Sequence, residues 1–181
     1  MARTASITQD TILNVSFELL QSEGIKAVSA RKLAAKANCS TQPIFRIFKN
    51  MDELWAELFV MSLANFENFH LAYPQESPVP FVNLGMAYIR FAQENKHLFA
   101  LLFVADKRYG KTLYDMLNGK AGSVGKELAK AKAEGCADPA GMFSKMWMVI
   151  HGAACMSMTG DFDLSETETR KLLEESYQAF S

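Results

Sequence analysis

The feature that most constrains the fold is a tight corner between two short segments of helical periodicity, within "SARKLAAKANCSTQPIFRIF" at residues 29–48. Apolar residues recur at helical spacing on both sides of "NCS". The join is about three residues long, too short for the crossover that parallel strands need. Two helices joined so tightly behind a preceding helix are typical of a helix-turn-helix, whose second member enters the major groove of DNA.

Residues that begin and end helices bracket the three N-terminal segments. Ser6, with Gln9 three residues later, has the spacing of a capping box, and Gly24 is placed to end the first helix. Ser29 is the predicted N-cap of the second helix, and Ser40 is that of the third. We therefore expect three short helices in this part of the chain, with the third presented by the corner.

The rest of the chain also has helical periodicity. A long periodic segment runs from Asp52 to the proline-rich stretch "YPQESPVP", and no strand-like alternation lasts long enough to compete. Further helices are predicted at 81–95, 97–105, 112–118, 123–134, 139–159 and 165–180. The expected fold is all-α with about nine helices: an N-terminal three-helix helix-turn-helix domain followed by a larger helical domain.

Basic residues are concentrated at the N-terminal end. Residues 1–50 hold seven basic and three acidic residues, whereas the remainder holds twelve and seventeen. A basic end on an acidic body suggests that one end meets a polyanion, although chance scatter of surface charge also explains a difference of this size. Because the balance shifts near Asn50, we expect a DNA-binding domain at 1–50 and a second domain at 51–181.

Two parts of the chain resemble one family. The stretch "ILNVSFELLQSEGIKAVSARKLAAKANCSTQPIFRIFKNMDELW" resembles the DNA-binding region of TetR-family transcriptional regulators. Further along, "YIRFAQENKHLFALLF" and "WMVIHGAA" resemble TetR C-terminal ligand domains with a Trp-His-Gly signature, here Trp147, His151 and Gly152. The resemblance implies an all-helical homodimer that binds double-stranded operator DNA through its third helix. It also implies a repressor that a small effector releases from DNA.

Three positions depart from the family pattern. Phe45 stands where the family usually has Tyr, Met51 where it usually has Lys, and Ile47 where it often has His or Tyr. Lys49 and Asn50 partly replace the missing phosphate contacts in this interpretation. Fewer phosphate contacts weaken binding and flatten its salt dependence by about 0.9 log units per lost contact.

The predicted DNA contacts fall into two groups. Glutamine pairs well with adenine and arginine with guanine, so the candidates for base or near-base contacts are Thr41, Gln42 and Arg46. The candidates for backbone contacts are Ser29, Arg31, Phe45 and Lys49. The alternative is that these side chains form an ordinary solvated helix face, and that Ser29 only caps its helix.

The C-terminal part is rich in adaptable apolar side chains, with ten Phe and nine Met in residues 51–181. Such a mixture usually packs as ordinary core, but Met also lets a cavity adapt to varied apolar shapes. We expect a lipophilic effector pocket near Phe91, Phe99, Phe103, Met146, Trp147 and His151. His151 either binds a polar group of the effector or packs with a bond to backbone or water.

Cysteine and histidine spacings indicate neither a metal nor a cofactor. Cys39, Cys136 and Cys155 lie far apart without a CxxC pair, which favours reduced thiols, and the three histidines are too scattered to specify a metal site. Cys39 is either a redox switch in the turn or a small buried contact, and its place before the predicted N-cap favours the contact.

The resemblance implies a homodimer that pairs residues 139–159 and 165–180 with their symmetry mates. The stretch "GAACMSM" offers small residues that permit close helix approach. Apolar spacing on the last helix is supplied by Leu172, Leu173, Tyr177 and Phe180.

Two other functions account for parts of the sequence. We expect no enzyme, because no Ser-His-Asp constellation, phosphate loop or paired carboxylate site stands out. An all-helical adaptor for a protein partner would explain the apolar helices but not the capped, basic corner. No apolar run reaches the roughly 18 residues of a membrane span and no signal peptide opens the chain, so we expect a cytoplasmic protein without membrane contact.

Overall fold

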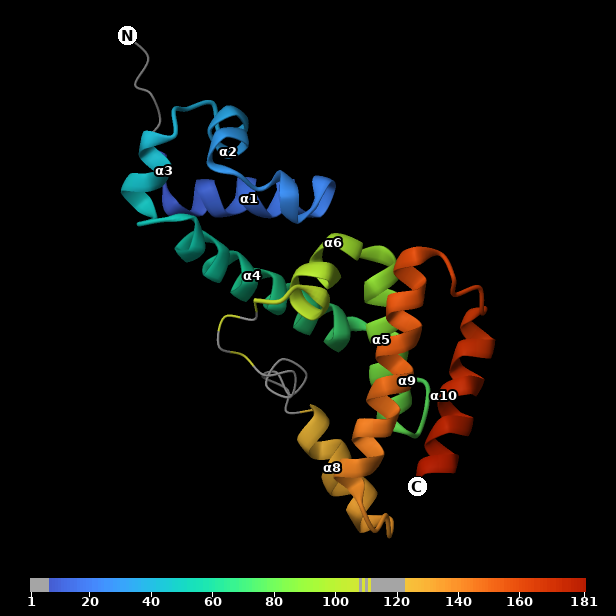
Figure 1. Ribbon diagram of the computed structural model, residues 1–181. Helices are drawn as coiled ribbons and strands as arrows, with labels where there is room; N and C mark the ends of the chain where they lie inside the picture. Colours follow the sequence, from blue (N-terminus) through green and yellow to red (C-terminus); the bar gives the residue numbers. More distant parts are fainter. Residues whose placement is uncertain (1–6, 108, 110, 112–122) are drawn as a thin grey trace. The chain divides into compact units, whose positions relative to one another are not determined.

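The computed structural model describes residues 7–107, 109, 111 and 123–181, and all regular structure in these residues is helical (Figure 1). Its nine α-helices are α1 (Gln9–Glu23), α2 (Ala30–Lys36), α3 (Gln42–Ile47), α4 (Met51–Ala72), α5 (Pro80–Glu94), α6 (Lys96–Phe99), α8 (Ser123–Ala133), α9 (Pro139–Thr159) and α10 (Glu166–Phe180). A 3₁₀ turn, η1, covers Ile25–Ala27, and a π-helix, η2, covers Ala100–Val104. The all-α prediction is confirmed, while the helix predicted at 112–118 lies outside the described residues.

The chain forms two compact units. The first comprises the residues up to Asn65 together with His97–Gly110, and the second comprises Phe66–Lys96 together with the residues from Lys111 onward. The units therefore divide within α4, whereas the predicted boundary after Asn50 coincides with the start of α4. That boundary stays a prediction about how the functions divide.

The ends of the first two helices test the capping predictions. The N-cap of α1 is Thr8, whose hydroxyl accepts the N–H of Thr11 at 3.2 Å, so the predicted capping box is wrong; Ser6 itself lies outside the described residues. Gly24 ends α1 as predicted, with φ +84°, a conformation that glycine adopts without strain. Ser29 caps α2 as predicted, since its hydroxyl accepts the N–H of Lys32 at 3.4 Å.

The prediction that Ser40 caps α3 is also wrong. The N-cap of α3 is Thr41, and its side chain makes no capping hydrogen bond. Pro43 is the second residue of α3 and has no N–H, so one of the two amides that a capping side chain binds is missing. The short helix is instead held by its buried side.

The second unit is built around α5, which contacts both α9 and α10, while α8 contacts α9 (Figure 1). Residues 81–89 of α5 are all buried. Gly85 lets the side chains of α9 and α10 approach α5 closely, because a Cβ there would lie 2.8 Å from Leu173 Cδ1 and 3.0 Å from the Ile150 side chain. The last turns of α4 join the same core, where the rings of Phe66 and Phe69 pack against Phe91 at 5.1 and 5.3 Å. Among the described residues, no helix is both long enough and apolar enough to cross a bilayer.

Candidate nucleic-acid interface and effector region

The corner between α2 and α3 is a Schellman motif centred on Asn38. Asn38 has φ +50°, a left-handed conformation that Asn tolerates better than most residues. Its N–H donates to the Ala35 carbonyl at 3.2 Å, and the N–H of Cys39 donates to the Ala34 carbonyl at 2.9 Å. These two bonds stop α2 and reverse the chain within a few residues. The chain can therefore start α3 immediately after α2.

The predicted recognition helix has one buried and one exposed side. Ile44 and Phe48 are buried in the first unit, and their burial anchors α3. On the opposite side Thr41, Gln42 and Arg46 are exposed. Phe45 lies on the same face, and its side chain is 48% exposed although it is large and apolar. The structure thus brings together four of the seven predicted DNA-contacting residues on one solvent-facing surface.

The three remaining predicted contacts, Ser29, Arg31 and Lys49, are also exposed but come from other elements. Ser29 already accepts its capping bond from Lys32, so its hydroxyl has a local role as well. The Lys49 N–H donates to Glu53 Oε2 at 2.6 Å, which fixes the backbone between α3 and α4. This bond leaves the Lys49 ammonium group available.

Ion pairing separates the basic residues near the corner into two sets. Lys32 and Lys36 are bound to carboxylates of α1, at 2.6 Å to Glu23 and 3.4 Å to Glu18. The Lys32 ammonium lowers the pKa of the Glu23 carboxyl through a hydrogen bond and its charge. In the part of the chain that the structure describes, Arg31, Arg46 and Lys49 have no ion-pair partner. The three basic residues among the predicted DNA contacts are therefore free to meet phosphates or bases.

In the second unit, Trp147 and His151 form a cluster with Tyr88 of α5. The His151 ring stacks on Trp147 with centroids 5.7 Å apart and an interplanar angle of 17°. A hydrogen bond of 3.0 Å joins Tyr88 Oη and His151 Nδ1. Cys155 Sγ lies 3.5 Å from His151 Nε2, and burial raises the pKa of that thiol. His151 thus has a side-chain partner that sequence reasoning missed, because no local signal links residues 63 positions apart.

The other predicted pocket residues lie in both units. Phe91 and Met146 are fully buried in the second unit. Phe99 and Phe103 are buried in the first unit, where their ring centroids lie 5.1 Å apart. The effector pocket as a whole stays a prediction. Within the described ranges, no group of three or more His, Cys, Asp or Glu side chains is arranged to hold a metal ion.

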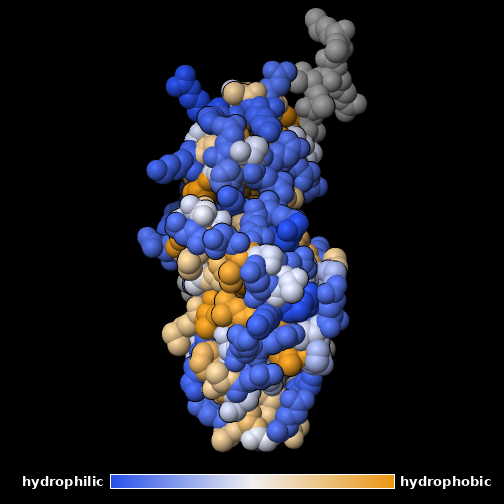
Figure 2. Space-filling model, turned by 90° about the vertical axis from the view of Figure 1, so that its right-hand side faces the viewer, coloured by the Kyte–Doolittle hydropathy of each residue, from blue (hydrophilic) through white to orange (hydrophobic). Residues whose placement is uncertain are grey.

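The long helix α9 carries an apolar stripe that the described residues leave exposed. Met148 and Met156 are 67% and 47% exposed, and Gly152 lies between them at four-residue spacing. A Cβ added at Gly152 would meet no atom within 4 Å. Figure 2 views the molecule from the right-hand side of Figure 1, and hydrophobic side chains interrupt the hydrophilic surface in the lower half of that face. On α10, in contrast, Leu173 is fully buried within its own unit.

Comparisons with known families match both parts of the chain. The family described as "Bacterial regulatory proteins, tetR family" matches residues 12–58. The family described as "Tetracyclin repressor-like, C-terminal domain" matches residues 81–180, more than half of the chain. Among curated proteins, no relative matches the sequence.

Solved structures share the fold at low sequence identity. A putative TetR-family regulator from Vibrio parahaemolyticus has a TM-score of 0.67 at 17% identity, covering 94% of this chain and 97% of its own. A TetR variant from Acinetobacter baumannii AYE in complex with minocycline has a TM-score of 0.61 at 16% identity, covering 96% of each chain. The multidrug binding protein EbrR, complexed with malachite green, has a TM-score of 0.62 at 17% identity, covering 92% and 96%.

Proposed function

Because this chain belongs to the TetR family of bacterial regulatory proteins, we propose that it is a repressor that leaves its operator when a small lipophilic effector binds. Residues 1–50 bind DNA in this proposal, and residues 51–181 bind the effector and dimerise. The protein acts in the cytoplasm and catalyses no reaction. The Trp-His-Gly subtype of the ligand domain is part of the proposal.

The exposed face of α3 carries the DNA-binding part of the proposal. Its apolar side, with Ile44 and Phe48, is buried, so the polar side is held at a fixed orientation toward solvent. In the proposal Gln42 bonds to adenine, Arg46 bonds to guanine, and Thr41 makes a near-base contact. A solvated face without function would explain the exposure but not the family match over residues 12–58.

Backbone contacts come from the rim of the same unit. The proposal assigns phosphate or sugar contacts to Ser29, Arg31, Phe45 and Lys49. The free ammonium of Lys49 and the free guanidinium of Arg31 support it, since neither charge is neutralised by a carboxylate of the described chain. Phe45 contributes apolar contact only, because it has no hydroxyl.

The effector site is proposed near Trp147 and His151, with Phe91, Phe99, Phe103 and Met146. Two of the similar structures hold the small molecules minocycline and malachite green, which supports a small-molecule effector for this chain. The Tyr88–His151 pair supports a polar anchor within apolar surroundings. Either hydrogen bond of the His151 ring, to Tyr88 or to Cys155, can be exchanged for one to a ligand.

The homodimer is proposed to form through α9 and α10. The exposed Met148 and Met156, with the open backbone at Gly152, provide an apolar stripe that a second copy can cover by close helix packing. A two-fold dimer would present two copies of α3 to DNA, so the operator should be a palindrome.

Selection from a random pool of duplex DNA, at low and moderate salt, tests the function. Enrichment of a palindrome by the wild-type protein, and its release by lipophilic compounds, is the expected result. Retention of DNA without enrichment, lost as salt rises, would mean that the basic end merely attracts phosphate and would favour the adaptor alternative.

A further inference from the structure

The second unit has a small surface pocket that contains none of the predicted effector residues. It lies between α5 and the start of α10 and has a volume of about 190 Å³. Met86, Ile89 and Leu164 form its apolar lining, and Tyr73, Arg90 and Glu166 are among its polar groups. We propose that this pocket binds a small zwitterion, a molecule with one ammonium and one carboxylate group on a short aliphatic body.

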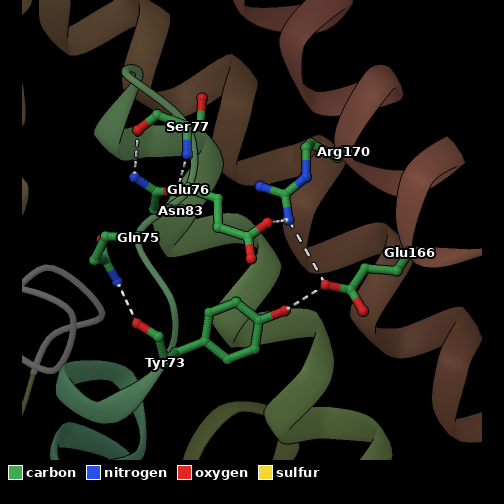
Figure 3. Close-up of polar contacts among 7 residues, drawn as sticks. All are labelled: Tyr73, Gln75, Glu76, Ser77, Asn83, Glu166 and Arg170. Carbon is green, nitrogen blue, oxygen red and sulfur yellow. Dashed lines mark hydrogen bonds and ion pairs between the residues drawn. The ribbon is translucent and has the colours of Figure 1, made fainter.

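The Glu166 side of the pocket offers an incompletely used carboxylate. Figure 3 shows Tyr73 directed at Glu166, and Arg170 between Glu166 and Glu76. Both contacts to Glu166 Oε1 are long, at 3.5 Å from Tyr73 Oη and 3.6 Å from Arg170. The short bond of Arg170, at 2.7 Å, goes to Glu76. The second carboxylate oxygen of Glu166 has no partner among the described residues, so Glu166 can accept hydrogen bonds from an ammonium group.

The Arg90 side offers the opposite charge. Arg90 Nε donates to Glu94 Oε1 at 2.6 Å, one turn further along α5. Its terminal nitrogens have no partner in the described part of the chain, and neither does the side-chain amide of Gln93, which also lines the pocket. A guanidinium with free terminal nitrogens suits a carboxylate, which it binds through parallel hydrogen bonds.

Arg90 and Glu166 line the same pocket without forming an ion pair with each other. A ligand with only an amine would bind Glu166 but would be repelled by the guanidinium of Arg90. A ligand with only a carboxylate would bind Arg90 but would be repelled by Glu166. A zwitterion complements both charges. The pocket is therefore matched to a dipolar ligand rather than to an ion of one sign.

The size of the pocket also limits the ligand. At ~30 Å³ per water molecule, 190 Å³ corresponds to about six waters, below the usual range of ~300–1,000 Å³ for drug-sized ligands. Met86 and Ile89 are almost completely buried, so they form a fixed apolar floor. A free amino acid with an aliphatic side chain has the right charges and about the right size. This site does not depend on operator binding.

Titration of the full-length protein with three related probes tests the inference. The probes are L-leucine, isoamylamine, which lacks the carboxylate, and 4-methylpentanoate, which lacks the amine. The readout is the ¹³C-methyl signal of Met86, assigned by comparison with Met86→Leu and observed without DNA. We expect leucine to shift this signal with a dissociation constant up to about fivefold lower than that of either singly charged probe, the upper end of what one exposed ion pair contributes.

Charge-neutralising variants supply the second arm. Glu166→Gln and Arg90→Gln should each weaken leucine binding by up to about fivefold. The matched controls Lys171→Gln and Glu175→Gln alter an exposed pair on α10 that does not line the pocket, and they should leave binding unchanged. Equal binding of leucine and either singly charged probe overturns the inference. So does unchanged binding in both pocket variants, or the absence of any leucine-dependent shift. Because all four side chains are exposed, matching thermal unfolding curves should establish that the variants fold.

Discussion

His97 Nδ1 lies 2.9 Å from the carbonyl oxygen of Gln21, so the imidazole bonds to the last turn of α1 from 76 residues away. Nδ1 must carry the proton, because a carbonyl oxygen only accepts. The ring also occupies the space beside Gly24, where an added Cβ would lie 3.0 Å from His97 Cδ2. One side chain thus connects the segment that begins at His97 to the end of the first helix.

His97→Ala should destabilise the protein by about 0.5–1.5 kcal/mol, because it removes a hydrogen bond to the last turn of α1. Urea unfolding measures the change. Lys96→Ala is the control, since Lys96 is an exposed neighbour with no bond to α1. Equal stabilities of the two variants would show that the Gln21 bond contributes nothing.

Lys49→Ala should weaken operator binding for all DNA sequences alike and reduce the salt slope by about 0.9 log units, because one phosphate contact is lost. Fluorescence anisotropy at several salt concentrations gives both quantities. Lys36→Ala provides the comparison, since Lys36 is already paired with Glu18. A salt slope equally reduced in Lys36→Ala would mean that the general field of the unit, not a specific contact, holds the phosphates.

Phe45→Tyr should strengthen operator binding about fivefold, because the added hydroxyl can donate to a phosphate, a contact worth about 1 kcal/mol. Phe45 is half exposed on the face of α3, so the larger residue fits without repacking the core. Binding should be compared at fixed salt, with unfolding curves to establish equal stability. Weaker or unchanged binding would place this ring away from the DNA backbone.

Met148→Glu should shift the protein from dimer to monomer, because it places a charge in the middle of the proposed α9 interface. Sedimentation equilibrium measures the assembly state. Leu71→Glu is the matched control: Leu71 is also a large exposed apolar residue, 61% accessible, but it lies on α4. A dimer that withstands the Met148 change would move the interface elsewhere.

His70 should make stability fall as the pH drops from 7.5 to 5.5. Burial lowers the pKa of its imidazole in the folded protein, so the unfolded chain takes up a proton first, near its ordinary pKa of ~6.5. Stability from this group is complete above that pKa and decreases below it. His70→Gln should flatten the decrease in urea unfolding over this range. An identical pH dependence in the variant would contradict the assignment.

Much of the fold follows from local sequence patterns. Capping chemistry predicts that α1 ends at Gly24 and that α2 begins after Ser29. Helical spacing predicts the burial of Ile44 and Phe48. The wrong N-caps at Ser6 and Ser40 show the limit of such patterns. Several hydroxyl residues precede each helix, and the choice among them depends on backbone conformation that a sequence does not display.

Contacts between residues far apart in the sequence could not be predicted from local patterns. The Tyr88–His151 bond and the bond from His97 to Gln21 join helices far apart in the chain, so periodicity carries no signal for either. The exposed face of α3 was predictable because it needs only helical geometry and its buried side. Whether each lysine forms an ion pair was not predictable, because Lys32 and Lys36 pair with carboxylates on α1, more than eight residues away in the sequence.

The most direct test of the central claim measures the affinity of wild-type protein and Arg46→Ala for a selected operator and its single-base variants. Arg46→Ala should lose about 1–3 kcal/mol of discrimination at one guanine in each half-site and keep its preferences elsewhere. A variant that binds all sequences more weakly by one common factor would contradict base reading by α3, and would reduce Arg46 to a phosphate contact.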